Sequence, residues 1–455
     1  MIIGKSKLNK EMLVTIVALA WPTMLEEAMQ TAVQYIDTAM VGVLGTQATA
    51  AVGATTTVSW LLWSTTAALG IGFLSFIARA WGSGDRQQAS RASAQAVLVT
   101  LVSGVVFTAL CLGLSDLVPV WMQVDPAIQN LAARYFFVLY APMLPRTALT
   151  VFGMVLRAAG DTKTPMKIGV SVNLINIALN FLLIYPTRTI LGVRVWGLGL
   201  GVVGAALASA IAFTIGGIAI TVVLWRHPEI SPRGSQILPD MEILRPCMQV
   251  ALPNMFQRFG TSLGYVAFAS MVNSLGEIAT AAHTIANTVE SAFYIPGYGM
   301  QTAAATLVGN AYGARDKKRM QDVSSMFIPI EVVLMIASGA TLFAFAPNLM
   351  GIFSDSAEVI TLGTTVLRMV ALSEPFYGVS IIVEGMMQGV GRTKAPFVYN
   401  IIGMWGIRIA GTYLCTQVLG YGLVSAWACM IGHNLLLFAL FLRSYSSGKW
   451  NPLMK

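Results

Sequence analysis

The residue best placed to do chemistry in this sequence is Asp37, an acid inside a long apolar segment. Gln30 and Gln34 precede it by seven and three residues, and Glu26 lies one helical turn before Gln30. These spacings put the four side chains on one face of a helix. An ionisable side chain at membrane depth is costly and marks a functional site by default. We therefore expect this polar stripe to line a cavity rather than face lipid.

The chemistry that such an acid offers is cation exchange. A carboxylate in surroundings of low dielectric holds a proton more firmly unless a cation offsets its charge. Asp37 can then bind H⁺, Na⁺ or an organic cation in turn, and competition between these ligands would couple their movements. The alternative interpretation is a buried carboxylate that only accepts hydrogen bonds from neighbouring helices.

A second polar set lies in the apolar segment 163–185. Asn173, Asn176 and Asn180 recur there at spacings of three and four residues, which place them on one helical face. Carbonyl oxygens are the ligands that hard cations take. The set is suited either to coordinating Na⁺ together with Asp37 or to holding the Asp37 carboxylate, and the simpler alternative is hydrogen bonding between helices.

Two further acids, Glu290 and Glu384, interrupt long apolar stretches. Each is a candidate for contact with a cationic substrate, or for a buried ion pair with Arg258 or Arg408. The sequence contains no Walker A motif, Gly-rich nucleotide loop or zinc motif. We therefore expect neither an enzyme nor ATP-driven transport within this chain, and no cofactor other than a coupling ion.

The elements that must position these residues are membrane-spanning helices. The chain is 56% hydrophobic and only 11% charged, whereas a soluble domain carries about 25% charged residues. Its apolar stretches reach the length of about 20 residues that crosses a bilayer. They fall near 13–40, 50–80, 92–114, 128–157, 163–185, 197–225, 244–271, 280–312, 323–346, 358–388, 395–418 and 420–444. This predicts an all-α membrane protein of twelve transmembrane helices.

The distribution of Lys and Arg predicts the orientation. Both termini and alternate loops hold 20 of the 28 basic residues, whereas the loops between them hold only Arg188 and Arg194. Because basic residues are concentrated on the cytoplasmic side, we expect both termini in the cytoplasm and a multi-pass protein of the inner (plasma) membrane. The same bias explains the net charge of +8, and nothing indicates nucleic-acid binding.

The chain consists of two similar halves. One constant shift along the sequence, here called the repeat shift, sets the segment 48–51 on 279–282, and Gly160 and Thr162 on Gly391 and Thr393. Each half carries six expected helices, so the two copies keep one orientation and are related by a pseudo-twofold axis along the membrane normal. We predict an N-lobe at 1–225, a cytoplasmic linker at 226–243 and a C-lobe at 244–455. A duplicated scaffold without transport is the alternative.

These motifs resemble those of the MATE (multidrug and toxic compound extrusion) family over nearly the whole chain. Trp21-Pro22 is followed by the run Asp37–Gly42, as in the family's opening helix. The loop motifs occur in pairs, at Trp81–Asp85 and Tyr312–Asp316 and again at Leu156–Thr162 and Met387–Thr393. A single motif would be weak evidence, but several that occur in order and in duplicate are specific.

The resemblance implies a secondary transporter of two six-helix lobes that exports amphipathic, mostly cationic drugs in exchange for inward H⁺ or Na⁺. It implies that Asp37 is the family's essential first-helix acid and that Tyr140 is a cavity tyrosine. Many relatives carry an acid where Asn180 stands, so the choice of ion stays open. We expect a monomer that contacts membrane lipid. The expected substrate-binding residues are Glu26, Gln30, Gln34, Tyr140, Glu290 and Glu384. A Na⁺ ion would take Asp37, Asn176 and Asn180.

The two lobes differ in the equivalents of the polar stripe. The repeat partners of Asp37 and Gln34 are Phe268 and Tyr265, so ion binding is predicted in the first lobe. NorM-like and eukaryotic relatives carry an acid on the seventh helix, where Thr261 or Gly260 stands here. This difference favours the DinF-like prokaryotic branch.

Other functions fit the sequence less well. A lipid-linked saccharide flippase of the same superfamily should carry several Arg or Lys residues in its cavity, and only Arg146, Arg258 and Arg408 are candidates. A receptor or scaffold would need a ligand domain, for which the short loops leave no room. A channel would need a ring of equivalent acids.

Overall fold

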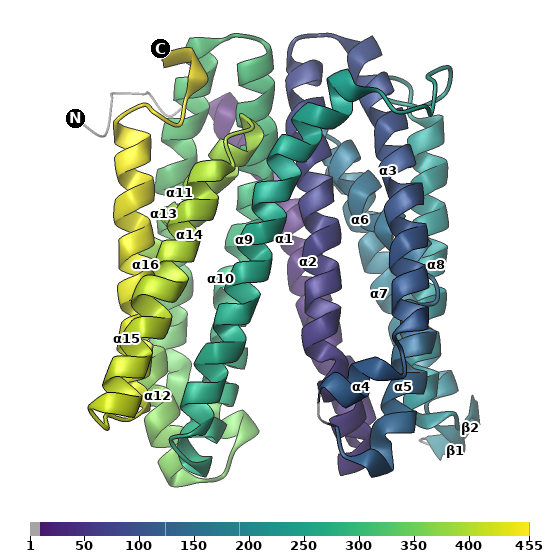
Figure 1. Cartoon of the computed structure of the whole chain (residues 1–455), viewed down its shortest axis with the longest axis vertical. Helices are drawn as coiled ribbons and strands as arrows, with labels where there is room; N and C mark the ends of the chain where they lie inside the picture. Colours follow the sequence, from purple (N-terminus) through teal and green to yellow (C-terminus); the bar gives the residue numbers. More distant parts are fainter. Residues whose placement is uncertain (1–9, 123, 191, 455) are drawn as a thin grey trace. The chain divides into compact units, whose positions relative to one another are not determined.

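The computed structural model describes residues 10–122, 124–190 and 192–454, and nearly all of them are helical (Figure 1). The chain forms two compact units. The N-terminal unit comprises Ala28–Ile77 and Asp85–Arg245, and the C-terminal unit comprises Met1–Glu27, Ala78–Gly84 and Pro246–Lys455. The helices α1 (Lys10–Gly42) and α2 (Thr46–Gly82) contribute to both units.

Helices and one short hairpin build the N-terminal unit. Besides parts of α1 and α2, it contains α3 (Arg86–Gly113), α4 (Leu117–Trp121), α5 (Pro126–Tyr140), α6 (Met143–Ala158), α7 (Lys163–Leu183), β1 (Pro186–Ile190), β2 (Val193–Leu198) and α8 (Gly201–Arg226). The strands are antiparallel, with Arg188 opposite Val195. The predicted linker lies against α3, where Arg91 Nη2 is 2.5 Å from Asp240 Oδ2.

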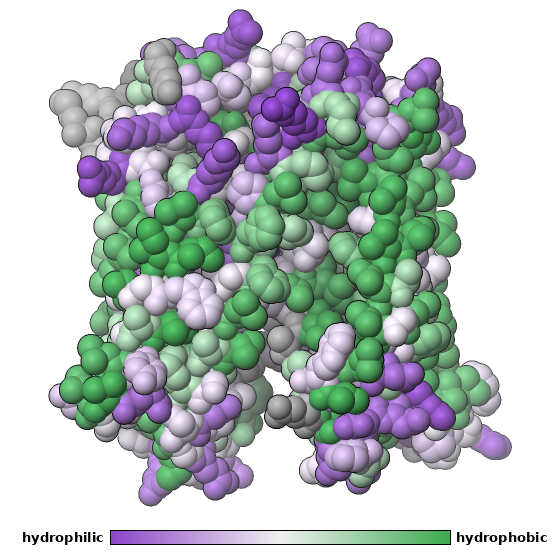
Figure 2. All heavy atoms as spheres, in the orientation of Figure 1, coloured by the Kyte–Doolittle hydropathy of each residue, from purple (hydrophilic) through white to green (hydrophobic). Residues whose placement is uncertain are grey.

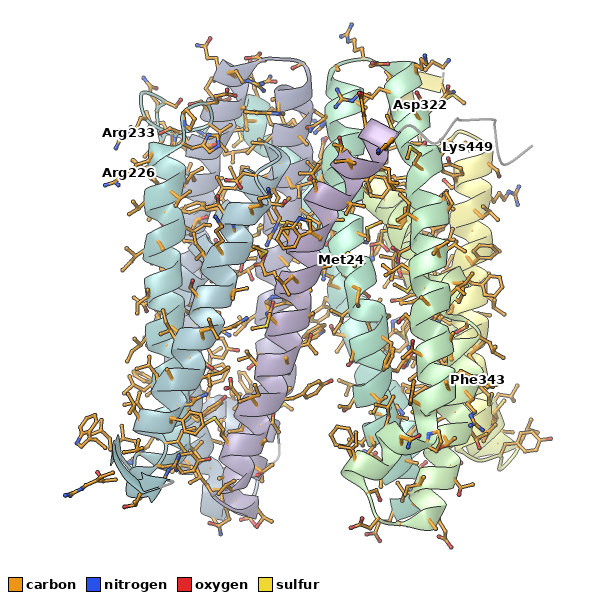
Figure 3. The ribbon with its side chains drawn as sticks, turned by 180° about the vertical axis from the view of Figure 1, so that it is seen from behind. Met24, Arg226, Arg233, Asp322, Phe343 and Lys449 are labelled. Carbon is orange, nitrogen blue, oxygen red and sulfur yellow. The ribbon has the colours of Figure 1, made fainter. Side chains whose placement is uncertain are left out.

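The C-terminal unit contains the remaining elements. These are α9 (Met241–Asn273), α10 (Glu277–Gly313), α11 (Lys317–Phe353), α12 (Ala357–Ala371), α13 (Glu374–Gly389), α14 (Lys394–Ile401), the π-helix η1 (Ile402–Ile409), α15 (Ala410–Thr412), the π-helix η2 (Tyr413–Val418), α16 (Leu423–Ser446) and the 3₁₀ helix η3 (Pro452–Met454). Its core joins Ile16 of α1 to Phe327 and Ile382. The Thr23 hydroxyl donates to the Gly299 carbonyl across 2.9 Å, next to Met24, which Figure 3 labels on α1.

The predicted repeat is present in the element boundaries. The repeat shift carries the bounds of α1 onto those of α9, and it likewise carries α2 onto α10, α5 onto α12 and α6 onto α13. The helix starts are also repeated. The Asp85 carboxylate caps α3 by accepting from Gln88 N, and Asp316 caps α11 by accepting from Arg319 N. A side-chain acceptor at this position satisfies a backbone N–H that the helix leaves free.

Two of the repeated elements are bent spans. The pair α5 and α6 bends by 50°, and the pair α12 and α13 bends by 52°. Pro142 precedes α6 and Pro375 lies at the start of α13, where the missing N–H of proline prevents a continuous helix. Each bend therefore has a local cause in the sequence, and Tyr140 and Glu374 lie beside the two breaks.

The surface is that of a multi-pass membrane protein. Among the described residues, seven helices are long and apolar enough to cross a membrane, or up to nine if each bent pair is one span. Figure 2 shows hydrophobic residues over the middle of the drawn face and hydrophilic residues toward its two ends. Val102, Val105 and Val333 are more than half exposed, as expected of residues that contact lipid. In Figure 3, Phe343 lies toward the end of the C-terminal unit opposite to Lys449.

Candidate functional site

The N-terminal unit brings Asp37 together with two of the three predicted asparagines. α1 carries Asp37 and α7 carries Asn176 and Asn180, both of which are buried. The Asn180 amide nitrogen donates to Asp37 Oδ1 across 2.5 Å and lies 3.3 Å from Asn176 Oδ1. Two residues one turn apart on α7 therefore face one carboxylate on α1, as their spacing predicted.

The orientation of the Asn176 amide determines which atoms surround Asp37. In one orientation its nitrogen donates to Ser209 Oγ of α8 across 2.9 Å. After half a turn the nitrogen lies 3.0 and 3.2 Å from the two Asp37 oxygens, and its oxygen accepts from Ser209. The second orientation satisfies both ends of the amide, because it sets a donor rather than an acceptor against the carboxylate. Asn176 thus donates to the ionised Asp37, and its oxygen would face Asp37 only with a proton or a cation between them.

The oxygens around Asp37 suit a small cation. The buried Asn180 Oδ1 has no hydrogen-bond partner among the described residues. Asn176 and Asn180 both present amide nitrogens to Asp37, so half a turn of each amide would be needed before their oxygens, with the carboxylate, supplied the hard ligands that alkali and alkaline-earth ions take. The three described ion pairs lie at Arg86 and Arg91 and do not involve Asp37. The carboxylate is therefore held by neutral amides, which leaves it free to take either a proton or a cation.

The other predicted residues of the N-terminal half lie apart from this contact. Gln30 and Gln34 are exposed on α1, and Glu26 belongs to the C-terminal unit. No hydrogen bond joins Asn173 to Asp37 in the described part of the chain. Tyr140 is only 1% exposed and packs against Phe136.

An arginine covers the ring of Tyr140. The guanidinium carbon of Arg146 lies 5.0 Å from the centre of the Tyr140 ring and 4.1 Å from that of Phe213. Such cation–π contacts hold an arginine in an apolar setting. In this structure Tyr140 is thus a core residue beside the bend of α5 and α6 rather than an open contact surface.

In the C-terminal unit, Glu384 is held in a similar way to Asp37. Its Oε1 accepts from Gln257 across 2.8 Å and from Gln388 across 3.2 Å, and its Oε2 accepts from Asn400 across 3.2 Å. The donors come from α9, α13 and α14, so this carboxylate links three elements. The charge of Arg258 also acts on Glu384. Three amide donors can stabilise the ionised form without neutralising it.

Glu290 lies in a different environment, close to a buried arginine. Its side chain is 6% exposed, and the charge of Arg408 acts on it. Arg408 is 4% exposed and lies 4.7 and 4.4 Å from the ring centres of Tyr265 and Phe268. These two rings are the repeat partners of Gln34 and Asp37. In this unit a cation therefore lies over the ring that stands at the position of the acid in the other unit.

A cluster of three tyrosines near these acids was missing from the sequence predictions. Tyr294 and Tyr298 of α10 and Tyr377 of α13 are partly buried. The Tyr298 and Tyr377 hydroxyls are 3.0 Å apart, and the Tyr294 ring meets both other rings edge-on at 5.9 Å. Glu290, Tyr294 and Tyr298 recur every fourth residue, and this spacing could have revealed the shared face. Aromatic rings next to carboxylates form a typical site for organic cations.

Two buried acids were also missed. Glu331 of α11 is 0% exposed and Glu374 of α13 is 2% exposed. Both interrupt apolar stretches, so the rule that selected Glu290 and Glu384 would have selected them as well.

Comparison with known proteins gives a consistent family. The model of the MatE family matches residues 22–182 and 253–414, and the repeat shift carries the start of the first match onto the start of the second. The Thermotoga maritima protein named "Probable multidrug resistance protein NorM" is 28% identical over 437 residues, covering 96% of this chain and 92% of that protein. Human multidrug and toxin extrusion protein 1 is 24% identical over 430 residues, covering 93% and 72%.

Solved structures show the same fold. An outward-facing multidrug resistance MATE transporter is 25% identical, with a TM-score of 0.87 and coverage of 97% of this chain and 96% of that one. A MOP superfamily transporter from Pyrococcus furiosus is 26% identical, with a TM-score of 0.88 and coverage of 99% and 100%. That transporter is described as having a binding pocket of reverse polarity, which suggests a different function for it.

Proposed function

Because this chain belongs to the MatE family, we propose that it is a secondary active exporter that drives amphipathic cationic compounds outward by the inward movement of H⁺ or Na⁺. The observation that carries this proposal is the Asp37 carboxylate within a transmembrane helix, held by Asn180 and without an ion-pair partner among the described residues. Efflux of a fluorescent cation from membrane vesicles under an imposed ion gradient tests it.

The coupling ion binds at Asp37, Asn176 and Asn180 in this proposal. Na⁺ would take oxygen ligands from these three side chains, whereas H⁺ would need only the carboxylate. Asn176 and Asn180 carry no ionisable group, so Asp37 is the one charge in the site. The site therefore balances the charge of one H⁺ or one Na⁺ at a time. The described geometry supports both ions, and the comparison of gradients decides between them.

The substrate binds in the C-terminal unit, at the tyrosine cluster between Glu290 and Glu384. Glu290 lies one helical turn before Tyr294 on α10, and Glu384 lies two turns after Tyr377 on α13, so an acid adjoins the cluster on each of its two helices. Partly exposed rings and carboxylates attract a flat organic cation through cation–π and charge interactions.

We extend the fold to twelve spans in two six-helix lobes joined by the linker 226–243. The seven apolar helices and the two bent pairs supply nine of these spans. The other three are α9 and α10, which have 33 and 37 residues, and the helical stretch Lys394–Val418 that runs from α14 through η2. At about 1.5 Å per residue each exceeds the hydrocarbon core of about 30 Å. Because no acid stands at Thr261, we place the chain nearer to the DinF-like branch of the family. We further propose that it is a monomer in the plasma membrane.

The positive-inside bias predicts the orientation of these spans, with both termini in the cytoplasm. Ser83, Thr46 and Ser446 are exposed, so a cysteine at each is reachable from its own side of the membrane. In a background without the four native cysteines, a membrane-impermeant thiol reagent added to intact cells should label Thr46→Cys and spare Ser83→Cys and Ser446→Cys. All three should react in broken cells. The opposite pattern in intact cells would overturn the orientation.

A lipid-linked saccharide flippase is the alternative, and the arginines argue against it. Binding a phosphate-bearing substrate requires guanidinium groups that can reach it. Arg146 is stacked between Tyr140 and Phe213, and Arg408 is buried against two rings. Asp37 and Glu384 instead offer negative charge, which favours cationic substrates.

A further inference from the structure

The C-terminal unit contains a buried carboxyl group that is part of neither of the sites described above. Glu331 lies within α11, one of the apolar helices that can cross a membrane, and its side chain is 0% exposed. Neither of its carboxyl oxygens has a hydrogen-bond partner among the described residues. It belongs neither to the amide-held site of Glu384 nor to the tyrosine cluster.

Two glycines shape the space that holds this carboxyl. A Cβ atom added at Gly297 of α10 would lie 2.7 Å from Glu331 Oε1, and one added at Gly378 of α13 would lie 3.2 Å from the same atom. The first distance is shorter than real side chains show, and the second is unusually tight. The missing side chains let the Glu331 carboxyl lie against the backbones of α10 and α13, with Met335 closing the slot. The slot is therefore tight, and the Glu331 side chain in it is closed off from bulk solvent.

A second acid lies next to it. Glu374 is the first residue of α13, at the bend that follows α12, and it is 2% exposed with no partner for its Oε2 in the described chain. Gly378, against which the Glu331 carboxyl lies, is one helical turn after Glu374 on α13, so the two acids approach the same stretch of this helix. A Cβ atom added at Gly339 of α11 would lie 2.6 Å from the Ala371 carbonyl oxygen and 3.6 Å from Glu374 Cβ, so α11 lies close against the bend that carries Glu374.

The groups around the pair offer no positive charge. Among the described residues, no Lys, Arg or His forms an ion pair with Glu331 or with Glu374. Two ionised carboxylates in such a slot would bear the full cost of desolvation together with mutual repulsion.

We propose that Glu331 and Glu374 form a second proton-binding site, separate from Asp37, in which both acids are neutral while α11 and α13 are packed as described. Loss of a proton to water leaves a carboxylate that the slot cannot solvate. Release therefore requires α11 and α13 to separate and admit water at the bend between α12 and α13. The site binds H⁺ in preference to Na⁺, because the slot offers neither room nor further oxygen ligands for an ion.

Infrared spectroscopy of the purified protein tests the proposal without any transport. A protonated carboxylic acid has a carbonyl stretching band that a carboxylate lacks. The wild type at neutral pH should show this band, and Glu331→Gln and Glu374→Gln should each reduce it, since glutamine matches the size of the neutral acid. Glu358→Gln, at an exposed acid of α12, is the matched control and should leave it unchanged. Equal bands in the wild type and in the variant lacking both acids would overturn the proposal.

A glycine variant tests the slot while both acids are kept, in case a glutamine variant does not fold. In Gly378→Ala the added Cβ meets Met335 Cγ at 2.6 Å and Glu331 Cγ and Oε1 at 3.2 Å, so the wall of the slot and the carboxyl must both move and the band should shift in frequency. Gly351→Ala on the same α11 meets nothing within 4 Å and should not shift it. An identical band in both alanine variants contradicts the slot. Because the readout is protonation, it can fail while drug efflux persists, which distinguishes this inference from the proposed function.

Discussion

Asp37→Asn is expected to abolish ion-driven efflux while the protein still folds and inserts. Asparagine has the size of aspartate and can still bond to Asn180, but it can neither take up a proton nor balance the charge of a cation. Transport coupled to this carboxylate then stops rather than slows. The measurement is export of a fluorescent cation by cells or vesicles that contain equal amounts of wild type and variant in the membrane.

Asp355→Asn is the matched control, because Asp355 is an exposed acid between α11 and α12. It should export at the wild-type rate, which excludes a general effect of losing one negative charge. Efflux by Asp37→Asn within about twofold of wild type, or less than about 0.4 kcal/mol in free-energy terms, would remove Asp37 from the mechanism.

Asn180→Ala and Glu384→Gln should have different effects, because the two units do different things. Asn180 donates directly to Asp37, and loss of a hydrogen bond to a charged group costs about 1.5–3 kcal/mol. The affinity for the coupling ion should change by about tenfold to hundredfold, which alters the ion concentration at which efflux is half-maximal. Ser171→Ala, at an exposed position of the same α7, should not alter it.

Glu384→Gln should instead change which compounds are exported. Glutamine keeps the size of the side chain that Gln257 and Asn400 contact but removes the charge that attracts a cationic drug. Divalent organic cations should lose more transport than monovalent or neutral ones, at an unchanged ion dependence. Efflux assays with several substrates across ion concentrations compare both variants. If Glu384→Gln abolished transport of every substrate and Asn180→Ala changed nothing, the coupling site would lie in the C-terminal unit.

The architecture could be predicted because the signals are repeated along the chain. The repeat shift reproduces the bounds of four helices, and Asn176 and Asn180, which their spacing places on one face, both lie within hydrogen-bond distance of Asp37. Helical periodicity and gene duplication are properties of the sequence itself. The contact between Asp37 and Asn180 followed from the cost of leaving polar groups alone in an apolar segment.

The chemistry of the C-terminal unit was harder to predict because it depends on packing between distant segments. The space that the Glu331 carboxyl fills depends on Gly297 and Gly378. Both glycines lie on other helices, and nothing in the sequence of α11 indicates them. The π-helical turns of η1 set the position of Arg408, and a rotation of this kind follows from tertiary contacts rather than from periodicity. Comparison of the two halves showed that Phe268 stands at the position of Asp37. It did not show that Arg408 lies over the Phe268 ring.

The most direct test of the central claim is efflux of ethidium from vesicles under an imposed Na⁺ gradient, compared with an imposed pH gradient and with no gradient. The account predicts that ethidium moves against its own gradient when one of the two ions runs inward across the membrane, and that Asp37→Asn vesicles show no such movement. Equal ethidium movement with and without both gradients would contradict coupled export by this protein.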